Sequence, residues 1–134
     1  MIPLSESGKI QVETVVLPDD IDVIVISDSL RTRQTAEILQ KKQPKLIPIV
    51  VESNLYPWDS GAKDWNTYWK RYYNFATNYS PNAGYETKES MRARLEKVIS
   101  KYANQNALII AHSVLLSNYI GRDYLDYCEL IQIN

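Results

Sequence analysis

The sequence is poor in residues that cross-link a chain or carry acid–base chemistry. It contains one cysteine, Cys128, and one histidine, His112, among 134 residues. A single cysteine excludes an intramolecular disulfide and a cysteine-based structural zinc site. A single histidine excludes any mechanism that needs two histidines from this chain.

Neither charge nor apolar runs indicate a polyelectrolyte or a membrane as partner. Fifteen Lys and Arg stand against 16 Asp and Glu, a net charge of −1, so no basic nucleic-acid-binding character is visible. The longest mostly apolar stretches, such as 21–26 and 107–111, are far shorter than the roughly 20 residues of a membrane span. Residues 1–6 lack the basic and apolar regions of a signal peptide. We therefore expect one cytoplasmic domain, 1–134, without nucleic-acid or membrane partners.

What is present is an alternation of strand-like and helix-like segments. Four short runs rich in β-branched residues predict strands at 22–27, 46–51, 107–111 and 129–133. Apolar residues at helical spacing predict helices over 29–42 and 88–103, and a shorter helix between His112 and Gly121. Alternating strands and helices favour an α/β fold with a mostly parallel sheet.

The segment 58–79 is unusually aromatic. Trp65, Tyr68, Trp69, Tyr72 and Tyr79 follow helical spacing and predict one aromatic helix face. The simplest interpretation is a helix that covers the core. A lid facing the substrate or a subunit contact is the alternative, because exposed aromatic patches often mark binding sites.

Two candidate site residues follow predicted strands. Arg31 lies in 27–36, where the first strand runs into a helix, and His112 closes the apolar run 107–111. Open α/β folds bind ligands at the carboxyl ends of their strands, and an arginine there can hold a phosphate. Position alone leaves a surface ion pair open for Arg31 and a structural role open for His112. Arg33, farther along the helix, is expected to point to solvent.

Together these segments resemble the histidine phosphatase superfamily, also called phosphoglycerate mutase-like. Residues 27–36 are similar to its S-x-x-x-R-A-x-Q-T-A signature, and 108–113 to the strand that ends in its second histidine. Residues 81–87 resemble the family's P-x-G-G-E-S loop, and Arg94 stands where the family often has an arginine. Residues 3–11 are similar to the P-L-T-x-x-G-x-x-Q start of a family helix. The motifs occur in the family's order over nearly the whole chain. The resemblance implies a three-layer α/β/α fold with a mostly parallel sheet.

The departures from the family pattern bear on activity. The resemblance implies a nucleophilic histidine in an Arg-His-Gly tripeptide, which this sequence lacks, while His112 aligns with the second histidine. Pro57 stands where the family has a glutamate acid, which leaves Asp59 or Glu86 as substitute proton donors. The resemblance implies no metal and no organic cofactor. We expect a catalytically inactive family member that retains weak binding of phosphate or a phosphorylated small molecule. The alternatives are a shortened form of an active phosphatase or mutase, and a non-enzymatic assembly module.

The resemblance also concerns the sheet. In the family, the strand that carries the Arg-His-Gly motif lies beside the strand ending in the second histidine, and we expect it to be missing here. Either 129–133 moves in to pair with 107–111, or another chain supplies a strand, because unpaired backbone groups of an interior strand are costly. We therefore expect a homodimer, with 129–133 or the aromatic helix in the contact.

Overall fold

A computed structural model describes residues 3–133, and it confirms the α/β class. The strands are β1 (Val23–Ile26), β2 (Ile49–Val51) and β3 (Ala107–Ile110). The helices are α1 (Glu6–Glu13), α2 (Leu30–Lys41), α3 (Trp65–Thr77), α4 (Lys88–Lys101) and α5 (Ser113–Ile120), with one 3₁₀ turn, η1 (Ser53–Leu55). None of the helices in this part of the chain is long and apolar enough to cross a membrane.

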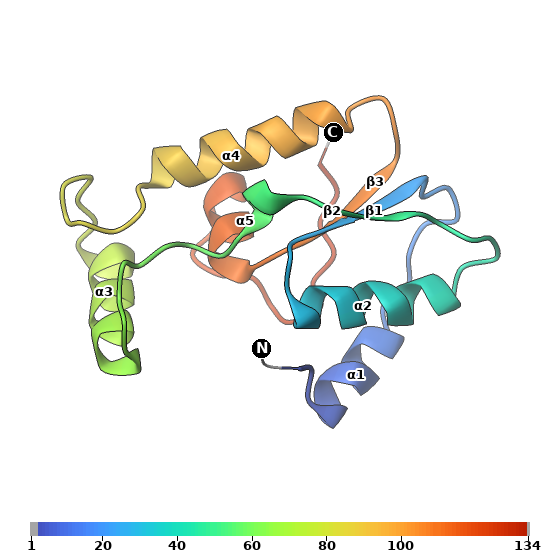
Figure 1. Ribbon diagram of the computed structural model, residues 1–134, viewed down its shortest axis with the longest axis horizontal. Coiled ribbons are helices and arrows are strands. Elements are labelled where there is room, and N and C mark those ends of the chain that lie inside the picture. Colours follow the sequence, from blue (N-terminus) through green and yellow to red (C-terminus); the bar gives the residue numbers. More distant parts are fainter. Residues whose placement is uncertain (1–2, 134) are drawn as a thin grey trace.

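The sheet is parallel, with strand order β2-β1-β3. All four residues of β1 are buried, as expected for a strand covered on both faces. Val23 and Val25 point to the layer of α4 and α5, whereas Ile24 and Ile26 point to the layer of α2. Figure 1 shows these two helical layers on opposite sides of the sheet, with α1 beside α2 and α3 at one end of the molecule. The predicted three-layer arrangement is confirmed.

Polar side chains define most helix starts. Ser5, Ser29, Asp64 and Thr87 each accept a hydrogen bond from a backbone N–H of the first turn, at the starts of α1, α2, α3 and α4. At α5 the cap position is His112, whose side chain makes no such bond. Gly121 ends α5 at a φ of 75°, a left-handed conformation that favours glycine. The first turn of α5 therefore keeps N–H groups without a side-chain cap.

The prediction of a strand at 129–133 is wrong. The sheet of the described residues has three strands, and 129–133 is not one of them. Side chains hold this segment instead: Glu129 forms an ion pair with Arg122 and accepts a hydrogen bond from the Asp126 N–H at 3.0 Å. Leu130 and Ile133 stay about half exposed. β3 thus lies at an edge of the sheet, with all four residues half-buried, and the homodimer stays a prediction.

The aromatic segment forms the expected helix, and the rings of Trp65, Tyr68, Trp69 and Tyr72 contact one another along it, whereas Tyr79 lies beyond its end. Tyr68 and Tyr72 lie against the buried Trp58, with ring centroids 6.1 and 6.3 Å from it. Trp65 and Trp69 are instead 68% and 59% exposed. The rings that the sequence pattern grouped together therefore divide between a packed side and a side open to solvent.

Burial of Leu55 anchors the loop after β2 to the core. Its side chain is fully buried in the cluster between the sheet and α4, whereas Leu46 is 87% exposed. We expect Leu55→Ala to lower the free energy of unfolding by about 2–5 kcal/mol, because it removes buried methyl groups and leaves a cavity. Leu46→Ala, the matched control, should change it by less than about 0.5 kcal/mol. Denaturant unfolding followed by circular dichroism measures both, and equal effects would contradict this account of the core.

Candidate functional site

The ends of two neighbouring strands bring Ser27 and His112 together. Because β1 and β3 are adjacent and parallel, their carboxyl ends lie at the same edge of the sheet. The Ser27 N–H donates to the Ile110 carbonyl at 3.2 Å, which continues the ladder one residue beyond β1. The Ser27 Oγ then lies 2.9 Å from Nε2 of His112. The imidazole is thereby held at the second residue after β3.

The hydroxyl groups around Ser27 favour one form of the His112 ring. The Thr32 hydroxyl donates to the Ser27 backbone carbonyl at 2.8 Å, so its oxygen accepts from the Ser27 hydroxyl at 3.2 Å. The Ser27 oxygen is then free to accept from the imidazole. This network places the hydrogen of the neutral ring on Nε2 and leaves Nδ1 without one.

Burial and nearby charge disfavour the protonated ring. Burial lowers the pKa of His112, and the positive charges of Arg31 and Arg94 lower it further. The imidazole is therefore uncharged at neutral pH in the free protein. An anion bound beside it would counter both effects and raise the pKa of His112 again.

Arg31, His112 and Asp59 line one pocket of about 900 Å³. One wall is the carboxyl edge of the sheet, with Ser29, Arg31, Thr32, Ala111, His112 and Ser113. A second wall comes from the loop after β2 and the start of α3, with Pro57, Trp58, Asp59, Lys63, Trp65 and Tyr68. Arg33 is exposed and is not part of either wall, as expected. Simultaneous contact of Arg31 and His112 with one anion stays a prediction.

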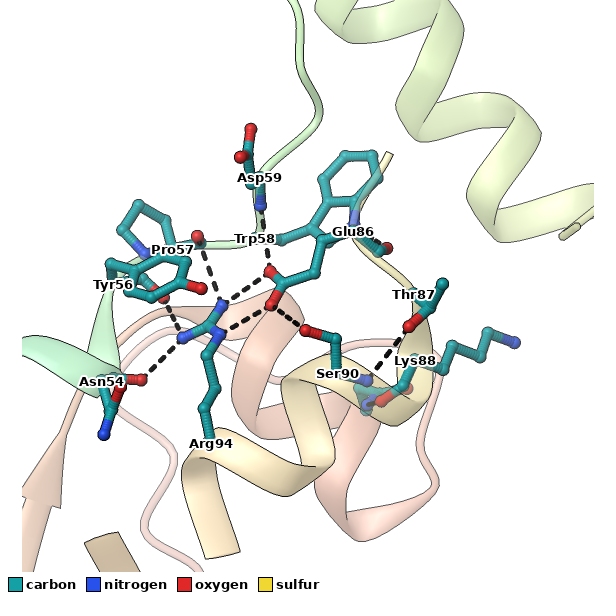
Figure 2. Close-up of polar contacts among 11 residues, drawn as sticks. Asn54, Tyr56, Pro57, Trp58, Asp59, Glu86, Thr87, Lys88, Ser90 and Arg94 are labelled. Carbon is teal, nitrogen blue, oxygen red and sulfur yellow. Dashed lines mark hydrogen bonds and ion pairs between the residues drawn. The ribbon is translucent and has the colours of Figure 1, made fainter. Parts of the chain in front are cut away.

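Glu86 and Arg94 form a buried ion pair that fixes the second wall. The Nε and Nη2 of Arg94 each donate to a carboxylate oxygen of Glu86 at 2.8 Å, and the two side chains are only 7% and 6% exposed. The Nη1 of Arg94 donates to the carbonyls of Asn54 and Tyr56, at 2.8 and 2.6 Å, and its guanidinium lies over the Tyr56 ring. Figure 2 shows Arg94 between Glu86 and this loop. Arg94, which stands at the position of a frequent family arginine, therefore holds the loop after β2 against α4.

The two candidate acids differ in their surroundings. Burial raises the pKa of Glu86, but hydrogen bonds from Arg94, the Asp59 N–H and Ser90 outweigh it and hold that pKa below its ordinary value. A carboxyl group held ionised has no proton to donate. Asp59 is exposed and lines the pocket, and in Figure 2 its carboxylate points away from the Arg94–Glu86 pair. Asp59 is therefore the candidate with access to a bound ligand.

Sequence reasoning missed the contribution of Ser27, and of Tyr127, which lines the same pocket. Ser27 carries a detectable signal: a small polar residue directly after a fully apolar strand. Tyr127 carries none, because its place depends on the irregular path of the chain after α5. Its hydroxyl lies so close to Gly8 that a Cβ there would be 2.8 Å away, which shows how tightly this path packs on α1.

The ion pair predicts a strong effect of Glu86→Gln on stability. We expect a loss of about 3–5 kcal/mol at neutral pH, because Arg94 is left buried without a counter-charge. The folded-state pKa of Glu86 lies below its ordinary value of 4.5, so its contribution is complete above that value and is lost as pH falls through the folded-state pKa. The variant should therefore lose less stability than the parent chain between about pH 6 and about pH 3. Denaturant unfolding across this range is the measurement, with the exposed Glu37→Gln as control. A variant that behaves like the control would contradict a stabilising role of the Arg94–Glu86 ion pair.

Comparisons with known proteins agree with this fold. A structure of Bacillus stearothermophilus YhfR is 19% identical with a TM-score of 0.62, over 85% of this chain and 62% of that one. A putative α-ribazole-5′-P phosphatase from Escherichia coli is 19% identical with a TM-score of 0.64, over 89% and 66%. A mycobacterial glucosyl-3-phosphoglycerate phosphatase in complex with VO₃ is 18% identical with a TM-score of 0.59, over 90% and 68%.

The chain thus spans about two thirds or less of the length of the first two structures. No curated protein sequence gives a significant match. The model of the histidine phosphatase superfamily (branch 1) matches residues 2–123, and so confirms the resemblance seen in the motifs. The chain is a member of the histidine phosphatase superfamily.

Proposed function

We propose that this chain binds phosphate monoesters through Arg31 and His112 and hydrolyses them very slowly. The observation that carries the proposal is that these two side chains, from the ends of different strands, line one pocket. The Arg31 side chain is exposed and makes no ion pair with any other residue in 3–133. Its guanidinium is therefore available to a ligand, and its planar fork of N–H groups matches two phosphate oxygens.

His112 and the start of α5 would complete the anion site. The uncapped N–H groups of the first turn of α5 carry partial positive charge, which favours an anion beside Ser113. The imidazole gains a proton most easily when a dianion is bound, since the anion offsets the charge of Arg31. Binding of a phosphate monoester would then be coupled to proton uptake by His112.

The composition of the chain supports slow turnover. Nucleophilic phosphoryl transfer splits one difficult displacement into two easier steps, and it requires a nucleophile beside the bound phosphate. The family resemblance assigns this role to a histidine, and the only histidine here aligns with the other, charge-stabilising position. Asp59 remains as a proton donor, but an acid without the nucleophile leaves only direct attack by water. Loss of one member of such a catalytic unit costs several orders of magnitude in rate.

Phosphomonoester hydrolysis by a longer chain that contains this one is the second candidate function. The observation that favours it is the length of the similar structures, of which this chain spans 62% and 66% in two cases. A nucleophilic histidine outside these 134 residues would complete the pocket at the same strand edge. Hydrolysis of a phosphate monoester by such a longer chain, compared with that by the present chain, separates the two candidates.

The proposed anion site predicts a pH-dependent affinity for sulfate, which keeps its double negative charge near neutral pH. Affinity should rise from about pH 8 to about pH 5.5, because bound sulfate stabilises protonated His112. Arg31→Ala should weaken binding about tenfold or more, since a hydrogen-bonded charge is lost. Arg33→Ala, on the same helix but outside the pocket, should leave affinity unchanged. Isothermal titration calorimetry tests all three, and equal effects of the two arginine substitutions would overturn the site.

Slow turnover predicts that hydrolysis of p-nitrophenyl phosphate by this chain, in which His112 is the one imidazole, stays several orders of magnitude below that of an active family phosphatase. The reason is that no other imidazole is present to accept the phosphoryl group. Release of p-nitrophenolate, followed by absorbance over hours, is the measurement. Turnover comparable to that of an active family phosphatase, and abolished by His112→Ala, would show that the remaining histidine has taken over the nucleophilic role.

A further inference from the structure

The wall of the pocket that faces Arg31 and His112 is aromatic. Of the three exposed rings along α3, which are Trp65, Trp69 and Tyr73, Trp65 alone lines the pocket. Tyr68, one turn along, lines it as well. In Figure 1, α3 stands apart from both helical layers, at the end of the molecule toward which the carboxyl ends of β1 and β3 point. One pocket thus joins an anion-binding edge to an aromatic surface.

Trp65 and Tyr68 form a corner suited to a flat ring. Their ring centroids lie 5.6 Å apart, and their planes meet at 81°. A planar ligand could stack on one ring and receive an edge contact from the other, the two geometries that aromatic pairs prefer. Trp65 is 68% exposed, so most of this surface is free to contact a ligand.

The charges around the corner do not oppose a phosphorylated ligand. The Asp64 carboxylate is engaged as the cap of α3, where it accepts from the Thr67 N–H at 2.8 Å and the Thr67 hydroxyl at 3.0 Å. Asp59 likewise accepts from the Gly61 N–H at 2.9 Å. Lys63 is exposed on the same wall and adds positive charge. The pocket therefore combines Arg31 and His112 at the edge of the sheet with a wall that carries aromatic rings, Lys63 and hydrogen-bonded carboxylates.

We propose that the preferred ligand is a phosphate monoester of an aromatic or heteroaromatic ring, with the ring against Trp65 and Tyr68. This inference rests on the proposed function, because it takes the phosphate to lie at Arg31 and His112. The volume of about 900 Å³ exceeds what a phosphate ion fills and falls among small-molecule sites. Trp65 is on this basis a specificity-determining residue.

Calorimetric titration with three phosphate esters tests the proposal. Phenyl phosphate should bind about tenfold more tightly than methyl phosphate, because its ring can stack on an aromatic side chain. Cyclohexyl phosphate, similar in size but without a π face, should bind more weakly than phenyl phosphate. Trp65→Ala should reduce the preference for phenyl over methyl phosphate to less than about threefold while leaving methyl phosphate affinity unchanged. Trp65→Phe should retain most of the preference.

Tyr73→Ala is the matched control, because Tyr73 is an exposed ring on the same helix that does not line the pocket. Tyr73→Ala should leave the preference for phenyl over methyl phosphate intact. Loss of that preference in this variant would overturn the proposal, because it would place the ring of the ligand on the outer surface of α3. If methyl phosphate binds in an Arg31-dependent way but phenyl phosphate gains nothing, the aromatic inference fails and the anion site stands. If phenyl phosphate binds with the expected preference but independently of Arg31, the proposed function fails and the orientation inferred here fails with it. Absence of binding by all three esters would overturn both.

Discussion

The buried pair of Arg94 and Glu86 is the interaction on which the pocket depends. Removing two charges from water is expensive, and the cost is offset only when every donor and acceptor finds a partner. Arg94 meets that condition by donating to both oxygens of Glu86 and to backbone carbonyls of the loop after β2. The loop cannot move away from α4 without leaving part of the guanidinium unsatisfied. A segment with little regular structure is therefore held in one position.

The position of α3 follows from the same pair. Two more hydrogen bonds join the loop after β2 to Glu86. The Glu86 N–H donates to the Asp59 carbonyl at 2.8 Å, and the Trp58 indole N–H donates to the Glu86 carbonyl at 2.9 Å. Trp58 in turn supports the packed side of α3, where Tyr68, Tyr72 and Phe75 surround its ring. The second pocket wall is thus built outward from α4, through the loop, to the aromatic helix.

The elements that sequence predicted well are those whose local pattern and tertiary role agree. The apolar runs of β1 and β3 and the helical spacing of apolar residues in α2 and α4 led to the right elements within a few residues. The segment 129–133 has the composition of a strand, but a strand exists only with a paired neighbour, and composition does not specify one. For the site, strand ends indicated Arg31 and His112. The role of Arg94 was not predictable, because which carbonyls it reaches depends on the path of a distant loop.

The order of strands has a consequence for how the pocket comes into existence. β1 lies between β2 and β3, and the backbone hydrogen bond that extends its ladder, from the Asp22 N–H to the Asn106 carbonyl, joins residues 84 positions apart. Such a closure costs chain entropy before any contact repays it, and topologies dominated by distant contacts fold slowly. Arg31 lies within the segment that this contact closes, and His112 lies beyond the end of that segment. Arg31 and His112 therefore come together only after β3 has paired with β1. A chain in which these strands are not yet paired has no pocket.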